Sequence, residues 1–173
     1  MNFVLIKYTA PFGGLDLHFS ETALTGLYFS EGNNPQRSAE HITAHSVVGA
    51  ATCRPPIANH LVELTIRELD EYFAGTRRIF TIPLEPHGTD FRKSVWERLL
   101  HVPFGETKSY MDIAREIGNP KAPRAVGGAV GKNPISIIIP CHRIIGTNRS
   151  LTGFGGGIPI KKWLLTHEGI SYK

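Results

Sequence analysis

Cysteine is scarce in this chain: its 173 residues include only Cys53 and Cys141. Two cysteines are too few for a disulfide framework, so we expect both to be free thiols in a reducing compartment. No CxxC pair is present, which removes the usual sequence pattern of a thiolate zinc site. A site built from Cys53 with His41, His45 and His60 stays open, but we favour solvated or structural histidines and expect no metal.

Long hydrophobic runs are also missing. No apolar stretch approaches the roughly 20 residues that cross a bilayer. The N-terminal segment MNFVLIKYTAPFGG lacks the basic flank and cleavage site of a signal peptide. We therefore expect a cytoplasmic protein with no membrane partner, long enough to bury one core or two small ones.

Acidic residues are few in the second half of the chain. Residues 89–173 hold 13 Lys plus Arg against 6 Asp plus Glu, whereas residues 1–88 hold 6 against 9. The halves thus carry net charges of +7 and −3. A basic half suggests a polyanionic partner such as nucleic acid, and a merely solubilising surface is the alternative.

The first half has the pattern of a small antiparallel sheet followed by a helix. Short apolar segments separated by turn residues predict a meander of three strands; they span residues 3–8, 15–20 and 23–30. A polar loop is expected at 30–40. A helix is predicted within 59–75, ending at Gly75, from four apolar positions at helical spacing: Val62, Ile66, Leu69 and Phe73.

A second domain is predicted to begin near Thr89, after an extended connection interrupted by Pro83 and Pro86. This divides the chain into domains at 1–88 and 89–173. Thr89 is a suitable N-cap for a helix whose apolar face comprises Phe91, Val95, Trp96, Leu99 and Leu100.

The next segment has the pattern of a helix-turn-helix. Ser109 and Asp112 fit a capping box, the first helix is expected to stop at Gly118, and a second helix is predicted over 123–130. A plain helical hairpin is the alternative.

Two glycines, Gly127 and Gly128, lie inside the second of these helices, where each costs about 1 kcal/mol relative to alanine. One explanation is close packing on a neighbouring helix. The other is close approach to a bulky ligand such as a nucleic-acid backbone, which the nearby Lys121, Arg124 and Lys132 favour.

The segment ISIIIPCHRIIG contains the most nucleophilic side chain, Cys141. We expect Ile137–Ile139 to form a short buried strand, with Cys141 where the strand becomes a turn. A free thiol needs a base or a positive field to react, and His142 and Arg143 are candidates for both. An inert buried cysteine is the alternative.

A carboxylate near the C-terminus completes this set. Glu168 is expected at the C-terminal end of a helix that starts near Pro159 and is capped by Gly169. The helix dipole disfavours an acid there, which is easier to understand if Glu168 pairs with an imidazole. A surface pair with lysine is the alternative.

These motifs closely resemble the O6-alkylguanine-DNA alkyltransferase family. The resemblance covers residues 89–173, through FGETKSY, PRAVGGAVGKNP, IPCHR and KKWLLTHEG; residues 1–88 agree in size and coarse pattern. It implies an N-terminal α/β domain that is ribonuclease H-like, with a small antiparallel sheet plus helix. A mostly α C-terminal domain with a winged helix-turn-helix-like motif would follow.

The resemblance also implies an activity: irreversible, stoichiometric transfer of the alkyl group from O6-alkylguanine in double-stranded DNA to Cys141. His142 would be the base, acting through a water, and Glu168 would orient it. Asn133 would brace the turn, and Tyr110 would donate to guanine N3. No cofactor is implied.

The DNA contacts implied by the resemblance lie in the minor groove, with Arg124 as a finger that takes the place of a flipped nucleotide. The positions carried over for DNA are Arg124, Ala125, Gly127, Gly128 and Lys132, and those for the extruded base are Tyr110, Ile144, Gly155 and Gly156. We expect a monomer. Clustering along DNA, the range of alkyl groups and activity on O4-alkylthymine stay open.

The chain departs from the family's pattern at two points, and two other functions stay open. The N-terminal zinc site of some relatives needs two cysteines, so it is not transferred, and Gly155 stands where some relatives carry a hydroxyl.

One of the two rival functions is a thiol hydrolase that uses Cys141, His142 and Glu168 with turnover. The other is a DNA-binding protein that senses alkylated bases without chemistry.

Overall fold

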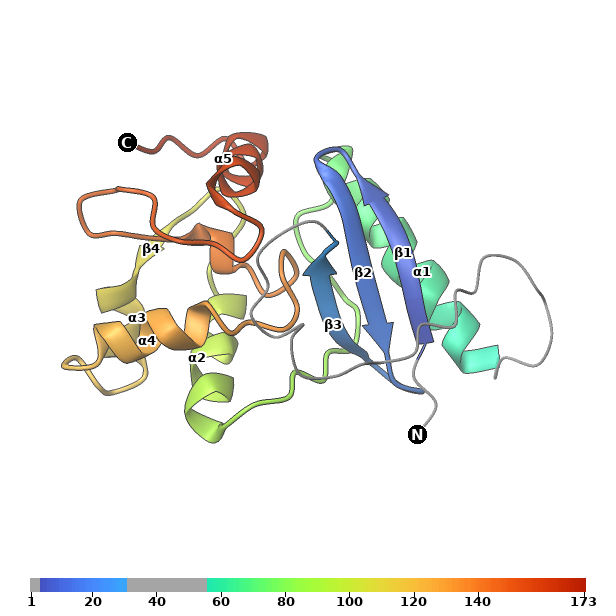
Figure 1. Ribbon diagram of the computed structural model, residues 1–173, viewed down its shortest axis with the longest axis horizontal. Coiled ribbons are helices and arrows are strands. Elements are labelled where there is room, and N and C mark those ends of the chain that lie inside the picture. The colour runs from blue at the N-terminus through green and yellow to red at the C-terminus, as the bar shows by residue number, and fades with distance from the viewer. Residues whose placement is uncertain (1–3, 31–55) are drawn as a thin grey trace.

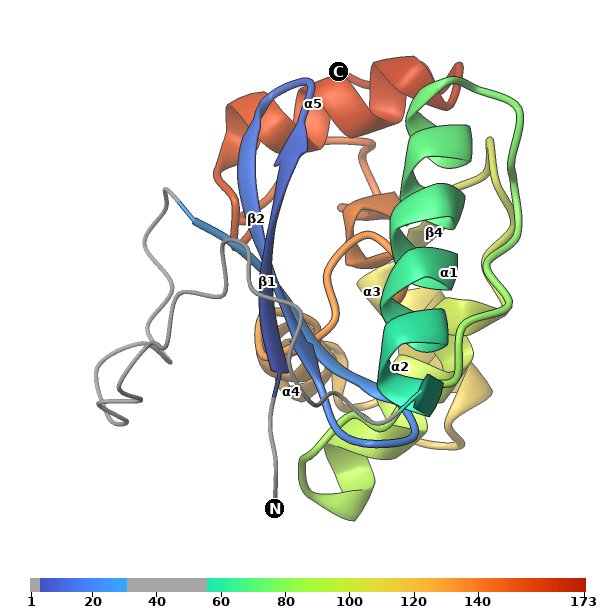
Figure 2. The ribbon, with the colours of Figure 1, turned by 90° about the vertical axis from the view of Figure 1, so that its right-hand side faces the viewer.

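The computed structural model describes residues 4–30 and 56–173. The N-terminal part is an antiparallel sheet in the order β1-β2-β3, whose strands are β1 (Val4–Ala10), β2 (Gly13–Phe19) and β3 (Leu24–Phe29). Helix α1 (Pro56–Phe73) runs along one face of this sheet (Figure 1, Figure 2). The predicted meander and helix are confirmed. The predicted loop at 30–40 and the residues His41, His45 and Cys53 lie outside the described residues, apart from Ser30.

β2 is the central strand, paired with β1 and with β3. Leu15, Leu17 and Phe19 are fully buried, and they lie on one face because successive side chains alternate across a strand. Helix α1 ends before Gly75, which adopts a φ of 77° that favours glycine, as the sequence predicts.

The C-terminal part is mostly helical. Its helices are α2 (Asp90–Leu100), α3 (Tyr110–Glu116), α4 (Pro123–Val130) and α5 (Ile158–His167), with a short 3-10 helix η1 (Cys141–Arg143). A two-stranded parallel sheet joins β4 (Lys108–Ser109) to β5 (Ile144–Ile145). Helices α3 and α4 pack together as the predicted helix-turn-helix. Within the described residues, no helix is both long and apolar enough to cross a bilayer.

Local capping chemistry sets where these helices begin. The side chain of Thr89 accepts a hydrogen bond from the backbone N–H of Arg92, and Ser109 forms the predicted capping box with Asp112. The expected apolar face of α2 is partly wrong. Its middle is buried, but Phe91 is 36% exposed and Leu100 is 47% exposed.

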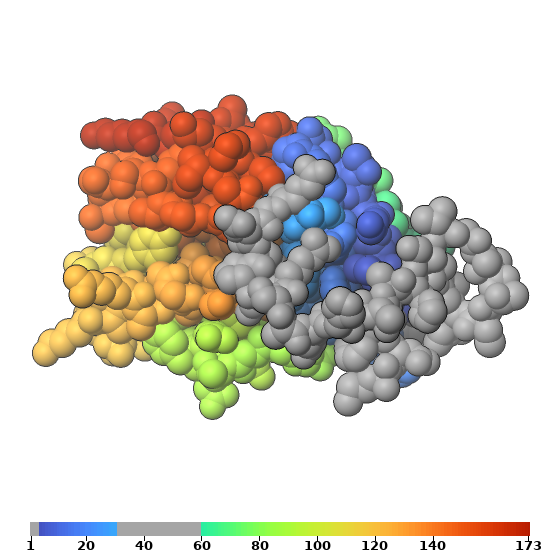
Figure 3. Space-filling model, in the orientation of Figure 1, coloured from blue at the N-terminus to red at the C-terminus, as the bar shows by residue number. Residues whose placement is uncertain are grey.

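The two parts share one hydrophobic core, and the sheet edge holds the segment that leads to Cys141. The N–H of Leu27 donates to the carbonyl of Pro134 at 2.8 Å, and the N–H of Ser136 donates to the carbonyl of Leu27 at 3.0 Å. The buried core cluster runs continuously from the sheet to the C-terminal helices. In Figure 3, the surface of α3 and α4, coloured yellow to orange, lies at the end of the molecule away from the sheet.

The strand predicted at Ile137–Ile139 is wrong, because these residues form a buried turn. Ile137 has a φ of 72°, and the N–H of Ile139 donates back to the carbonyl of Ile135 at 3.0 Å. The three isoleucines are buried, as expected, but their backbone bonds to its own neighbours rather than to a strand.

Candidate active site

Asn133 holds the turn that carries the cysteine. Its Nδ2 donates to the carbonyl of Ile139 at 2.8 Å, and its Oδ1 accepts from the N–H of Ile135 at 3.1 Å. One amide therefore closes the turn from both sides, immediately before Pro140 and Cys141. A left-handed Ile137 is unfavourable for a β-branched residue, so the turn depends on these supports.

Cys141 is the first residue of η1 and is 5% exposed. Burial raises the pKa of its thiol, and a hydrogen bond with the Asn133 side chain and the charge of Lys161 oppose this only in part. A buried thiol with a raised pKa is a poor nucleophile until a base removes its proton. The site therefore needs a proton acceptor close to Cys141.

His142, the next residue of η1, is the candidate for that acceptor. Its ring is fully buried, and Nε2 donates to Oε1 of Glu168 at 2.8 Å. Burial lowers the pKa of the imidazole, and the Glu168 carboxylate opposes the shift without cancelling it. The neutral ring keeps Nδ1 free of a proton, and this nitrogen has no hydrogen-bond partner among the described protein atoms.

Glu168 is the C-cap of α5 and is 4% exposed, so the alternative of a surface pair with lysine is wrong. Arg143 binds both carboxylate oxygens, with Nε to Oε2 at 2.8 Å and Nη2 to Oε1 at 2.9 Å. Burial by itself raises the pKa of this carboxyl, but hydrogen bonds from His142 and Arg143 and the positive charge of Arg143 lower it to about 2. The carboxylate is thus ionised throughout the physiological range.

Two buried residues near the site were missed from the sequence. Lys161 is fully buried, and its Nζ donates to the carbonyl of Ile144 at 2.6 Å. Burial lowers the pKa of this amine to about 8. Tyr72 of α1 is also fully buried, and its hydroxyl donates to Oε1 of Glu168 at 2.7 Å. Lys161 belongs to the KKW motif, but nothing local distinguishes it from the exposed Lys162.

Tyr110 begins α3, and its hydroxyl is 2.6 Å from Oγ1 of Thr152 in the loop before α5. Burial raises the pKa of this phenol, the hydrogen bond to Thr152 lowers it, and the nearby Cys141 raises it further. Tyr110 therefore keeps its proton and can act as a donor. No local motif marks Thr152 as a partner of Tyr110 in the sequence.

Helix α4 presents an exposed face. Arg124, Ala125 and Gly128 are exposed, and Lys132, just beyond the helix, is partly buried. A Cβ added at Gly128 would meet nothing within 4 Å, and one at Gly127 would make ordinary contact with the Tyr110 ring at 3.7 Å. Packing on a neighbouring helix therefore does not require either glycine.

The loop before α5 holds the two remaining glycines of the predicted base site. A Cβ at Gly155 would meet nothing within 4 Å, whereas one at Gly156 would lie 2.8 Å from the Phe29 ring. Packing against β3 thus already explains Gly156.

The backbone of Ile144 in β5 is already hydrogen-bonded within the protein. Its N–H donates to the carbonyl of Cys141, and its carbonyl accepts from Nζ of Lys161.

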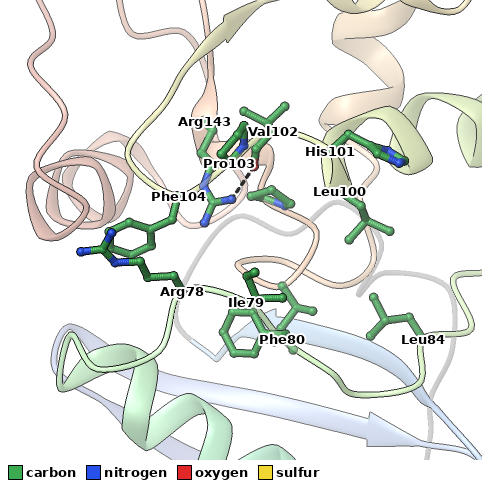
Figure 4. Close-up of a pocket in the computed structure, with 12 residues that line it drawn as sticks. Arg78, Ile79, Phe80, Leu84, Leu100, His101, Val102, Pro103, Phe104 and Arg143 are labelled. Atoms are coloured by element: carbon green, nitrogen blue, oxygen red, sulfur yellow. Dashed lines mark hydrogen bonds between the residues drawn. The ribbon is translucent and has the colours of Figure 1, made fainter.

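A cavity of about 400 Å³ lies between the interdomain connection and the end of α2. Figure 4 shows Arg78 and Arg143 on either side of the Phe104 ring at its rim, with Nη1 of Arg143 bonded to the carbonyl of Val102. Leu100 and Pro140 also line it, but Cys141 and Tyr110 do not. The cavity is therefore separate from the thiol.

No cluster of three or more His, Cys, Asp or Glu side chains suited to a metal ion occurs in residues 4–30 and 56–173. His60 is exposed on α1. The other members of the open metal alternative lie outside these residues.

The fold and the site define a class of protein: two domains, with a buried cysteine beside a histidine–carboxylate pair and a helix-turn-helix on the same domain. Two family models match the chain. They are described as 6-O-methylguanine DNA methyltransferase, ribonuclease-like domain, over residues 4–86, and 6-O-methylguanine DNA methyltransferase, DNA binding domain, over residues 90–170. The chain belongs to the 6-O-methylguanine DNA methyltransferase family, which confirms the resemblance and the predicted fold class.

Similar proteins agree with this assignment. The crystal structure of the Mycobacterium tuberculosis O6-methylguanine methyltransferase is 39% identical, with a TM-score of 0.78 over 96% of this chain and 93% of that one. A structure of the M. tuberculosis protein in complex with DNA is 40% identical, with a TM-score of 0.76 over 94% and 90%. The Methanosarcina acetivorans methylated-DNA--protein-cysteine methyltransferase is 55% identical over 103 residues, or 60% of this chain. The match spans 66% of that relative, just under two thirds of its length.

Proposed function

We propose that this protein repairs alkylated DNA by moving the alkyl group of O6-alkylguanine irreversibly onto Cys141, once per molecule. One observation carries the proposal: a buried thiol and a neutral, carboxylate-bound imidazole share one turn of 3-10 helix. Membership of the family and the solved DNA complex of a relative support DNA as the substrate.

The transfer is an in-line displacement at the alkyl carbon. The thiol proton passes to Nδ1 of His142 through a bridging water, the sulfur–carbon bond forms, and the bond from carbon to guanine O6 breaks. Glu168 stabilises the imidazolium that results. The electron pair of the broken bond stays on guanine, which takes up a proton and leaves as the normal base.

Tyr110 stabilises this leaving group by donating its hydroxyl hydrogen to guanine N3 as negative charge develops. Its raised pKa keeps that proton available. The base would lie between Tyr110 and the loop before α5, with the N–H of Gly155 as a further donor. Binding of the base exchanges the hydroxyl's contact with Thr152 for the contact with guanine.

DNA binds through the exposed face of α4, which enters the minor groove, with Arg124 inserted where the damaged nucleotide is extruded. The helix fits into the groove because its exposed face carries small residues, Ala125, Gly127 and Gly128. Lys132 contacts the DNA backbone. Because the minor groove distinguishes bases poorly, this mode suits a protein that scans all sequences.

Mass spectrometry after incubation with duplex DNA containing one O6-methylguanine tests the transfer. We expect a gain of one methylene on the peptide carrying Cys141, stoichiometric with protein and absent in Cys141→Ala. Turnover on an ester or amide would favour the hydrolase instead. Lesion binding by both proteins with no transfer by the wild type would leave only a sensor.

Replacing Gly128 by alanine tests the docking surface. The added methyl meets nothing in the protein, so the free energy of unfolding should rise by about 0.5–1 kcal/mol. Duplex affinity should fall at least about fivefold, since overpacking a contact typically costs about 1–3 kcal/mol. Denaturant unfolding and fluorescence anisotropy measure the two effects. Higher stability with unchanged affinity would place the DNA on another face.

A further inference from the structure

The N-terminal domain contributes a side chain to the Glu168 carboxylate. Tyr72 is in the last turn of α1, and Figure 2 shows α5 lying across that end of α1. The Tyr72 hydroxyl donates to Oε1 of Glu168 at 2.7 Å, the same oxygen that His142 binds at 2.8 Å. Tyr72, which lies 96 positions before Glu168 in the chain, thus shares one acceptor atom with the imidazole of His142.

The Tyr72 ring is fixed on several sides. It packs edge-on against Phe104 and Phe73, with ring centroids 6.2 Å and 5.3 Å away. Nε2 of His167 donates to the backbone carbonyl of Tyr72 at 2.7 Å. Since His167 directly precedes Glu168, α1 holds the end of α5 through both its backbone and its side chain.

We propose that Tyr72 is a positioning residue that sets the basicity of His142 through Glu168. This inference rests on the proposed function. It assigns the N-terminal domain a part in the chemistry in addition to covering the second domain.

The number of hydrogen-bond donors to Glu168 decides whether the pKa of His142 rises or falls when the Tyr72 hydroxyl is removed. Oε1 accepts from Tyr72, His142 and Arg143, and each donor reduces the negative charge that the carboxylate offers to the others. Without the Tyr72 hydroxyl, Glu168 would favour the imidazolium more strongly, and the pKa of His142 would rise. The other charged groups that act on His142 are Arg143 of η1 and Lys161 of α5. The titratable ring of His167 in α5 packs against the Tyr72 ring at 5.1 Å, and the loss of one hydroxyl changes none of these groups.

The test is the single-turnover rate of methyl transfer between pH 4.5 and 9 for wild type and Tyr72→Phe, which removes only the hydroxyl. We expect the acidic limb of the profile to move about half to one pH unit upward, so that transfer slows about three- to tenfold on that limb, at pH values below the pKa of His142. Tyr8→Phe is the matched control, because Tyr8 donates to a carboxylate of the same helix, Asp70, at 2.7 Å. Its profile should match the wild type.

A merely structural Tyr72 would give a different result. Partial unfolding lowers the observed rate in proportion to the folded fraction, so the rate at each pH is divided by the folded fraction measured by circular dichroism at that pH. A lower melting temperature with a superimposable profile, or no folded Tyr72→Phe at all, would overturn the inference. No methyl transfer by the wild type would instead overturn the proposed function.

Discussion

Replacing Glu168 by glutamine is expected to lower the free energy of unfolding at neutral pH by about 3–5 kcal/mol, the usual cost of breaking a buried ion pair. Both carboxylate oxygens accept from Arg143, so either orientation of the amide sets an NH₂ against a guanidinium donor. Methyl transfer should slow on the order of 10²-fold or more, because His142 loses the anion that stabilises its protonated form.

The pH dependence of the free energy of unfolding gives a second measurement for Glu168→Gln. The pKa of Glu168 lies near 2, below its ordinary value of 4.5. A lowered pKa stabilises the fold above pH 4.5, and the contribution is lost as the pH falls toward 2. Urea unfolding at pH 7, 5 and 3 should therefore show the gap between wild type and Glu168→Gln narrowing below pH 4.5.

Glu116→Gln is the matched control for this variant. Glu116 also pairs with a cation, Lys108, but its side chain is 33% exposed. Solvent screening should limit the loss there to about 1 kcal/mol or less. Equal unfolding midpoints for wild type and Glu168→Gln at pH 7 would show that the buried pair contributes nothing to stability.

The parts of the fold that could be predicted are those set by local chemistry. Thr89 and Ser109 cap helices with their own side chains, and Gly75 ends one by adopting a backbone conformation that favours glycine. The turn at Ile137–Ile139 could not be predicted, because three isoleucines suit a buried strand and a buried turn equally well. Its shape depends on the Asn133 amide and on pairing with Leu27, more than 100 residues earlier in the chain.

The candidate site likewise contains contacts that the sequence could predict and contacts that it could not. The pairing of His142 with Glu168 could be predicted, because an acid at a helix C-terminus indicates a nearby positive or hydrogen-bonding group. Arg143 was one of two candidates for a base or positive field near the thiol, and its guanidinium binds Glu168. Tyr72 and Lys161 could not be found, because only the packing of distant elements buries them and gives them their partners.

Replacing Asn133 by alanine should have the second large effect. The change leaves the N–H of Ile135 buried without its partner, while the carbonyl of Ile139 keeps one donor, the N–H of Cys141. An unsatisfied buried group costs about 1–3 kcal/mol and a lost hydrogen bond about 0.5–1.5 kcal/mol, so we expect a loss of about 1.5–4.5 kcal/mol in the free energy of unfolding. Asn148→Ala is the matched control. Asn148 accepts from the N–H of Ser150 at an exposed turn, where solvent replaces the lost bond, and the change there should be within about 0.5 kcal/mol.

In Asn133→Ala, the rate of methyl transfer should fall together with the free energy of unfolding. The rate should fall by more than the loss of folded protein accounts for. The turn fixes where Cys141 begins η1, and small displacements of a reacting atom are costly because displacement at carbon needs an aligned sulfur. The lost hydrogen bond to the sulfur also raises the pKa of the thiol further. The single-turnover rate constant should therefore drop even at temperatures where the variant is fully folded. An unchanged rate constant would mean that Pro140 and the β3 pairing hold the thiol without the amide, and that Asn133 serves stability alone.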